Sequence, residues 1–108
     1  CDEYFYLPHR KEPRGIGGIF FDYKSDSFEK DFKFVRDVGI TFQTLFNQII
    51  KKKMKKKWTL KDKESQYIKR GRYSEFNLLY DRGTKFGLQT GGNVEGILMS
   101  LPPLVKWK

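Results

Sequence analysis

The chain has 108 residues with 38% hydrophobic and 17% aromatic content, which fits one small domain or part of a larger one and makes an isolated core marginal. The formal net charge is +9, but six lysines within positions 51–57 supply most of it, so the remainder is only mildly basic. One cysteine excludes an intramolecular disulfide and makes a reducing compartment the default, and no apolar stretch approaches the ~20 residues that span a bilayer.

Residues 3–23 predict a β-hairpin. Residues 3–8 have the bulky side chains of a strand, and residues 14–23, rich in Ile and Phe, are predicted to be its partner. The turn between them lies between Pro8 and Pro13. Glycines near the start of the second strand indicate a bulge or a close approach by other atoms.

A long helix is predicted over residues 27–57. Apolar residues and one glycine recur there at intervals of three or four, which places them on one face. They are Phe28, Phe32, Val35, Gly39, Phe42, Phe46 and Ile49. Asp26 or Ser27 can cap the start, and the lysines near the end favour the negative end of the helix dipole. Gly39 suggests a close packing contact, because an interior glycine costs roughly 1 kcal/mol relative to alanine.

Four shorter elements are predicted after this helix. Thr59 is a candidate N-cap for a second helix over 60–70, and residues 72–80 follow as a strand. Residues 81–84 make a turn, and residues 85–89 return as an antiparallel strand. Asn93 can cap a short helix over 94–100, which Pro102 and Pro103 end. Four strands and two long helices predict an α+β layer arrangement.

Residues 91–93, Gly-Gly-Asn, form the first candidate site. They lie at a predicted strand-to-helix junction, where backbone N–H groups attract carboxylate or phosphate, although a plain turn has the same composition. Arg14 alone is typical of a surface arginine. His9 is the only histidine, so this chain cannot build a metal site from histidines. Asp22 has the position of a turn or cap residue.

The lysine run 51–57 has two interpretations. A solvated helix end is the ordinary one, and attraction to nucleic acid or an acidic partner is the sharper one. Only Trp58 adjoins the run as an aromatic stacking platform. Cys1 has no paired histidine nearby in sequence, so a catalytic thiol cannot be argued.

Three sequence segments resemble one enzyme family. They are YFYLPHR at 4–10, EPRGIGGIFFD at 12–22, and GRYSEFNLLYDRGTKFGLQTGGNVEGILMSL at 71–101. Together they resemble the oxygen-dependent coproporphyrinogen III oxidases of heme biosynthesis. The resemblance covers nearly all of this chain but only about the last third of the family enzyme. We therefore expect residues 1–108 to be the C-terminal segment of a single oxidase domain whose N-terminal part is absent.

The resemblance implies a fold and a reaction. The fold is α+β, with a large antiparallel sheet flanked by helices. The reaction is the oxidative decarboxylation of coproporphyrinogen III to protoporphyrinogen IX, with O₂ as co-substrate and with no cofactor required. The acid–base groups of the family lie upstream of Cys1, so we assign no catalytic residue to this segment.

The resemblance also implies roles for individual residues. It implies substrate binding at Gly91, Gly92 and Asn93, where the family usually carries arginine at the third position, and a carboxylate contact or structural role for Arg14. The motif His-Arg-x-Glu-x-Arg-Gly is kept as His9, Arg10, Glu12, Arg14 and Gly15. The position of His9 is assigned as a metal ligand in bacterial relatives and as a dimer contact in others. Lys11 replaces the usual glycine and Tyr23 the usual aspartate.

The expected partners are coproporphyrinogen III and a second copy of the chain, which would be contacted through residues 73–108. We expect no nucleic acid and no transmembrane segment. The expected compartment is the cytoplasm, with the mitochondrial intermembrane space as the alternative. Two other interpretations stay open: a non-catalytic basic module that binds RNA or an anionic partner, and a degenerate oxidase relative that has lost turnover.

Overall fold

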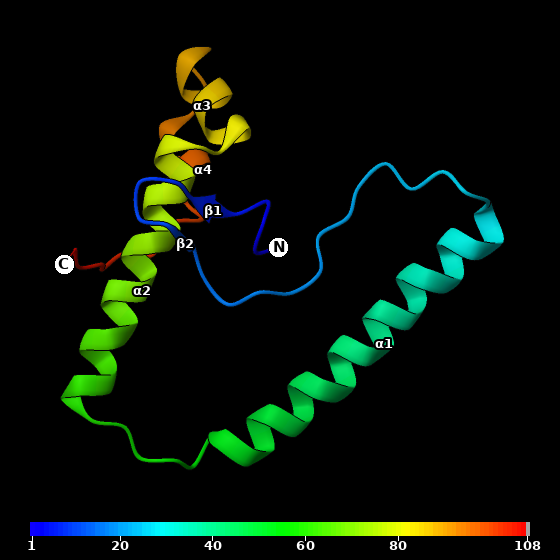
Figure 1. Ribbon diagram of the computed structural model, residues 1–108, viewed down its shortest axis with the longest axis horizontal. Coiled ribbons are helices and arrows are strands. Elements are labelled where there is room, and N and C mark those ends of the chain that lie inside the picture. The colour runs from blue at the N-terminus through cyan, green and yellow to red at the C-terminus, as the bar shows by residue number, and fades with distance from the viewer. Residues whose placement is uncertain (108) are drawn as a thin grey trace. The chain divides into compact units, whose positions relative to one another are not determined.

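The computed structural model describes residues 1–107 and divides them into two units (Figure 1). The first, here called the hairpin unit, consists of Cys1–Ile19 and Thr59–Lys108. The second, the α1 unit, is Phe20–Trp58. Within residues 1–107, no helix is long and apolar enough to cross a membrane.

The hairpin unit begins with a short antiparallel pair of strands. Strand β1 (Tyr6–Leu7) pairs with β2 (Glu12–Pro13), in the register Tyr6↔Pro13 and Leu7↔Glu12. The predicted hairpin is therefore confirmed, but both strands are much shorter than predicted. Residues 14–23 form no strand, although the Arg14 N–H still donates to the Phe5 carbonyl at 2.9 Å. Glycines in the residues that follow weaken extended pairing. Lys11 turns the chain with a φ of 55°, in the left-handed region that favours glycine.

Helix α1 (Phe28–Lys53) confirms the long predicted helix, although it ends four residues earlier. The Ser27 side chain caps it by accepting a hydrogen bond from the Lys30 N–H at 3.4 Å. No residue of α1 is buried, so its predicted apolar face is exposed within the described chain. Gly39 has no atom within 4 Å of a Cβ built on it, so the contact predicted there is not formed within residues 1–107.

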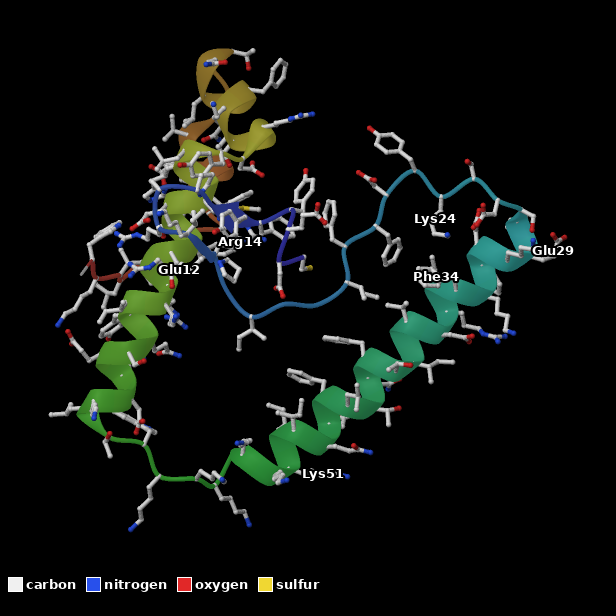
Figure 2. The ribbon with its side chains drawn as sticks, in the orientation of Figure 1. Glu12, Arg14, Lys24, Glu29, Phe34 and Lys51 are labelled. Atoms are coloured by element: carbon white, nitrogen blue, oxygen red, sulfur yellow. The ribbon has the colours of Figure 1, made fainter. Side chains whose placement is uncertain are left out.

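Residues 20–24 fold back onto the first turns of α1. The ring of Phe21 lies edge-on to that of Phe34 at 4.9 Å, and Lys24 Nζ lies 5.0 Å from the Phe34 ring centre (Figure 2). Lys24 also pairs with Asp26 at 3.4 Å and with Asp31 at 3.8 Å. These contacts pack the segment before α1 against the first turns of the helix.

Helix α2 (Leu60–Leu79) starts as predicted and continues much further. Thr59 and Asp62 form a capping box, with the Thr59 N–H donating to the Asp62 carboxylate at 2.8 Å. The strand predicted over 72–80 is wrong, because these residues extend the helix. Their aromatic residues also fit helical spacing: Tyr73, Phe76 and Tyr80 recur at intervals of three and four.

The predicted turn at residues 81–84 is the start of helix α3 (Arg82–Gln89), so the strand predicted over 85–89 is also wrong. Asp81 caps α3, and its carboxylate accepts from the Thr84 N–H at 2.7 Å. Helix α4 (Val94–Leu98) confirms the short helix predicted after Asn93, although it ends two residues earlier. Asn93 is its N-cap, as predicted, and accepts from the Gly96 N–H at 3.3 Å.

The core of the hairpin unit forms where the hairpin meets α2. Leu7 is 0% exposed and Phe76 is 5% exposed. The C-terminal segment lies against the middle of α2: the Lys106 N–H donates to the Tyr67 carbonyl at 3.1 Å. A methyl group at Gly71 would overlap the Lys106 carbonyl oxygen, so glycine permits this approach.

The fold therefore mixes helix and strand, as an α+β segment should. The two-stranded pair is the only sheet formed within residues 1–107, so the four predicted strands reduce to two.

Candidate functional site

Residues of the motif His-Arg-x-Glu-x-Arg-Gly contact helix α2. The hairpin lays the motif along the second half of that helix, and Figure 2 shows Glu12 and Arg14 on the hairpin beside it. We call the resulting group the motif cluster. It consists of His9, Arg10, Glu12 and Arg14 from the hairpin, with Arg72, Glu75 and Asn77 from α2.

Glu75 is the centre of the motif cluster. Its side chain is only 8% exposed and is held by two hairpin residues. Arg10 donates to both carboxylate oxygens, from Nε at 2.5 Å and from Nη2 at 2.6 Å, which is the bidentate geometry that suits a planar guanidinium. His9 Nε2 lies 2.8 Å from the same carboxylate. Because a carboxylate can only accept, the His9 Nε2–H donates to it.

These contacts keep Glu75 ionised. The hydrogen bond from Arg10, helped by that from His9 and opposed by burial, lowers the pKa of Glu75 from 4.5 to about 2. The same pair raises the pKa of Arg10 above its ordinary value. Glu75 therefore cannot donate a proton near neutral pH, and its place in the cluster is that of a charged anchor.

Glu12 and Arg72 make a second pair across the same interface. Arg72 Nε donates to the Glu12 carboxylate, and Lys69 lies 3.9 Å from it. The hydrogen bond from Arg72 lowers the pKa of Glu12. Arg72 also approaches Glu75, at 3.8 Å, so the two carboxylates and two of the arginines form one connected network.

Arg14 differs from Arg10 and Arg72, because it has no ion pair with any carboxylate among residues 1–107. Its guanidinium lies 3.7 Å from the ring centre of Phe5, 4.8 Å from that of Tyr73 and 4.9 Å from that of Phe76. Burial in this aromatic environment lowers the pKa of Arg14, although the group stays fully charged near neutral pH. Cation–π contacts hold the group without neutralising it.

Arg14 also lines a pocket of about 270 Å³ in the hairpin unit. The lining residues are Cys1, Asp2, Phe5, Pro13, Arg14, Gly15, Ile16 and Tyr73. The wall therefore carries a guanidinium, from Arg14, and a carboxylate, from Asp2, among mostly apolar residues. The guanidinium is the group in this wall that is able to pair with the carboxylate of a ligand.

His9 does not have the surroundings of a metal ligand in the described chain. Its Nε2–H donates to the Glu75 carboxylate, and its Nδ1 lies 2.8 Å from the Tyr80 hydroxyl. Within residues 1–107, no three His, Cys, Asp or Glu side chains gather where they could hold a metal ion. These residues do not fit a metal at His9, and its contacts are those of a clamp between Glu75 and Tyr80.

The candidate site at Gly91, Gly92 and Asn93 lies at the junction of α3 and α4. Gly91 has a φ of 73°, and its N–H donates to the Leu88 carbonyl at 3.4 Å. The Gly92 N–H donates to the Gly87 carbonyl at 2.9 Å, which completes a Schellman motif at the end of α3. Both glycine N–H groups therefore terminate a helix. The Asn93 oxygen caps the next helix, and substrate contact at these residues stays a prediction.

Three other features of the sequence stand apart from the motif cluster. Asp22 lies in the segment that folds back on α1, and its role stays a prediction. The lysine run spans the last turn of α1 and the residues beyond it, and all six side chains are exposed. Cys1 is partly buried and its sulfur lies near Gly18.

Sequence reasoning missed Glu75 and Asn77. Both lie in the stretch that was interpreted as a strand, where alternate side chains would face opposite sides. In a helix, Arg72 and Glu75 are three residues apart and share a face. A buried glutamate on a helix requires a cationic partner, and the arginines of the motif were the signal that could have identified one.

Comparisons with known proteins identify the family. The family model described as Coproporphyrinogen III oxidase matches residues 1–108. Oxygen-dependent coproporphyrinogen-III oxidase of Rickettsia bellii (strain OSU 85-389) is 65% identical over 108 residues, and that of Rickettsia akari (strain Hartford) is 64% identical. Each match covers 99% of this chain and 39% of the relative, in its C-terminal part. The chain thus spans about two fifths of the length of these relatives, and it belongs to the coproporphyrinogen III oxidase family.

Proposed function

We propose that this chain is the C-terminal segment of an enzyme that oxidatively decarboxylates coproporphyrinogen III to protoporphyrinogen IX. Support comes from its family and from relatives named oxygen-dependent coproporphyrinogen-III oxidase. In each of two steps a propionate becomes a vinyl group, losing CO₂ and two hydrogens. O₂ accepts the two electrons and two protons and leaves as hydrogen peroxide.

Arg14 is the residue of this chain that we propose contacts substrate, and its unneutralised guanidinium is the observation that carries the proposal. Coproporphyrinogen III carries four carboxylates on a macrocycle, so a guanidinium in an aromatic pocket suits one propionate. The pocket wall would exclude water and hold the propionate in place. We propose Gly91, Gly92 and Asn93 as a second contact with substrate. This proposal rests on the family resemblance, and no contact described in the hairpin unit supports it.

We assign no catalytic residue to this segment. The acid–base groups of the whole protein would come from residues that the relatives carry outside the matched 39%. O₂ is the only co-substrate in this proposal, and no step passes through a metal at His9.

A homodimer contact through residues 73–108 is proposed on the exposure of apolar side chains there. Leu78, Leu79 and Met99 are exposed, whereas Phe76 belongs to the core of the hairpin unit. The large antiparallel sheet of the family would form in the whole protein. We propose a cytoplasmic location, on the ground that the matched relatives are bacterial.

The test is turnover by the full-length protein. It would receive coproporphyrinogen III in air, and protoporphyrin fluorescence would be followed after oxidation of the product, with an anaerobic control. We expect oxygen-dependent formation of product. Binding of the porphyrinogen without turnover would indicate a degenerate relative. Neither binding nor turnover, together with salt-sensitive binding of RNA, would favour the lysine run as the functional feature.

Arg14→Gln tests the proposed contact within the same assay. We expect KM to rise at least about tenfold, because a charged hydrogen bond to a carboxylate is lost. Arg36→Gln is the matched control, because Arg36 is exposed on α1 and pairs only weakly with its neighbour Asp37 at 3.3 Å. An unchanged KM for Arg14→Gln would contradict the contact.

Asn93→Arg tests the second proposed contact. The change restores the residue that the family usually carries, so coproporphyrinogen affinity should rise about tenfold if Asn93 faces substrate. It also removes the cap of α4, at a cost of about 1 kcal/mol in folding stability. Unchanged affinity with the expected loss of stability would limit Asn93 to its capping role.

A further inference from the structure

Asn77 is a buried polar residue of α2, and the proposed function assigns no role to it. It is 7% exposed and contacts Arg14. Its Nδ2 donates to the Tyr73 carbonyl, one helical turn earlier, at 3.1 Å. Because only the NH₂ side of an amide can donate to a carbonyl, this bond fixes the orientation of the amide.

The fixed amide presents its oxygen to Arg14. The Arg14 Nη1–H donates to Asn77 Oδ1 in a long hydrogen bond of 3.4 Å. Phe5, Tyr73 and Phe76 surround the same guanidinium, so Asn77 supplies the only hydrogen-bond acceptor that the described residues offer it. A neutral oxygen orients the guanidinium and leaves its charge intact.

The neighbouring arginines show what a carboxylate would do in that place. Glu75 neutralises Arg10, and Glu12 neutralises Arg72, in the same interface. Aspartate at position 77 would have nearly the same shape as asparagine, but it would neutralise Arg14 internally. Arg14 is therefore held without an ion pair, although the charge of Asp81 acts on it at longer range, and its guanidinium can pair with an anion from outside.

We propose that Asn77 is the positioning residue for Arg14, orienting its guanidinium toward a substrate carboxylate while keeping its charge uncompensated. This inference rests on the proposed function, because the carboxylate is taken to be a propionate of the porphyrinogen. Asn77 itself touches no substrate in this account.

The experiment measures binding of coproporphyrin III, the oxidised tetracarboxylate that does not turn over, to the full-length protein. Fluorescence titrations at fixed ionic strength give Kd for the wild type and for Asn77→Asp, Asn77→Leu and Arg14→Gln. The two double variants, each Asn77 change combined with Arg14→Gln, complete two cycles. Asn47→Asp, which adds the same charge on an exposed part of α1, is the matched control.

We expect Asn77→Asp to raise Kd by about tenfold or more, because the new carboxylate competes with the ligand for Arg14. Asn77→Leu, which removes the acceptor and adds no charge, should raise Kd by a smaller factor, about threefold. In the Arg14→Gln background both changes should alter Kd by less than about twofold. Asn47→Asp should leave Kd unchanged.

Three results would overturn the inference. Equal losses of affinity in both backgrounds would mean that Asn77 acts through the fold and not through Arg14. Unchanged affinity for Asn77→Asp and Asn77→Leu, with a large loss for Arg14→Gln, would leave Arg14 as the contact and remove the role of Asn77. If Arg14→Gln has no effect on an active enzyme, the inference fails while the oxidase assignment stands. Absence of both turnover and porphyrin binding in the wild type would instead remove the proposed function.

Discussion

The hairpin unit and the α1 unit use the same residue types in different ways. In the hairpin unit, arginines, glutamates and phenylalanines from distant parts of the sequence contact one another around Leu7, Phe76 and Glu75. In the α1 unit, an equally regular stripe of phenylalanines is exposed, and no residue of the helix is buried. Local rules of capping and periodicity suffice to specify α1, whereas the hairpin and the second half of α2 specify each other.

The difference between the two units predicts where the loss of a charged side chain lowers the free energy of unfolding most. Glu75→Gln should lower the free energy of unfolding of the full-length protein by about 3 kcal/mol, because Arg10 would lose its buried partner. Glu29→Gln, the matched change in the first turn of α1, should cost no more than about 0.5 kcal/mol. Urea denaturation measures both. Equal effects would mean that the motif cluster carries no more energy than a surface residue.

Acid should weaken the contribution of Glu75 to the stability of the folded chain. The pKa of Glu75 is about 2 in the folded chain and 4.5 ordinarily, so its contribution to stability is complete above pH 4.5. That contribution is lost as the pH falls from 4.5 toward 2. The stability difference between wild type and Glu75→Gln should therefore shrink over this window. A difference that is constant from pH 6 to pH 3 would contradict the assigned pKa.

Two glycines offer a matched pair. Gly71→Ala should destabilise by about 2 kcal/mol, because its methyl group meets the Lys106 carbonyl oxygen. Gly39→Ala should stabilise by about 0.5–1 kcal/mol, because nothing in the described chain lies near it and alanine favours a helix. Thermal melts of the two variants give the comparison. A loss of stability for Gly39→Ala would reveal a close neighbour of α1 in the whole protein.

Two non-glycine residues with positive φ should give small effects. Lys11 and Tyr23 have φ values of 55° and 47°. The family resemblance implies glycine and aspartate at these positions. Lys11→Gly and Tyr23→Asn should each stabilise the folded protein by about 0.5–1 kcal/mol, because glycine and asparagine tolerate the left-handed region. Differential scanning calorimetry can resolve shifts of this size. No gain in either variant would mean that the whole protein relaxes these angles.

Features that depend on near neighbours in sequence were predictable. The cap at Ser27, the cap at Thr59 and the stripe of α1 follow from short patterns, and the structure has all of them. Residues 72–79 were not predictable as helix, because their aromatic and apolar residues fit either period until the hairpin supplies a partner for one face. Residues 82–89 likewise depend on neighbours beyond the local pattern, since α3 packs on α2 and α4. For the same reason Glu75 and Asn77 were missed. The motif around Arg14 singles that residue out, and its contact with substrate stays a prediction.

The most direct test of this account is the KM for coproporphyrinogen III in air, measured on the full-length protein with arginine and with glutamine at position 14. The account predicts oxygen-dependent turnover by the wild type and a KM at least about tenfold higher for Arg14→Gln, with the Arg36→Gln control unchanged. Equal KM values for the wild type and Arg14→Gln would contradict the claim that this segment contributes an unneutralised arginine to the substrate site.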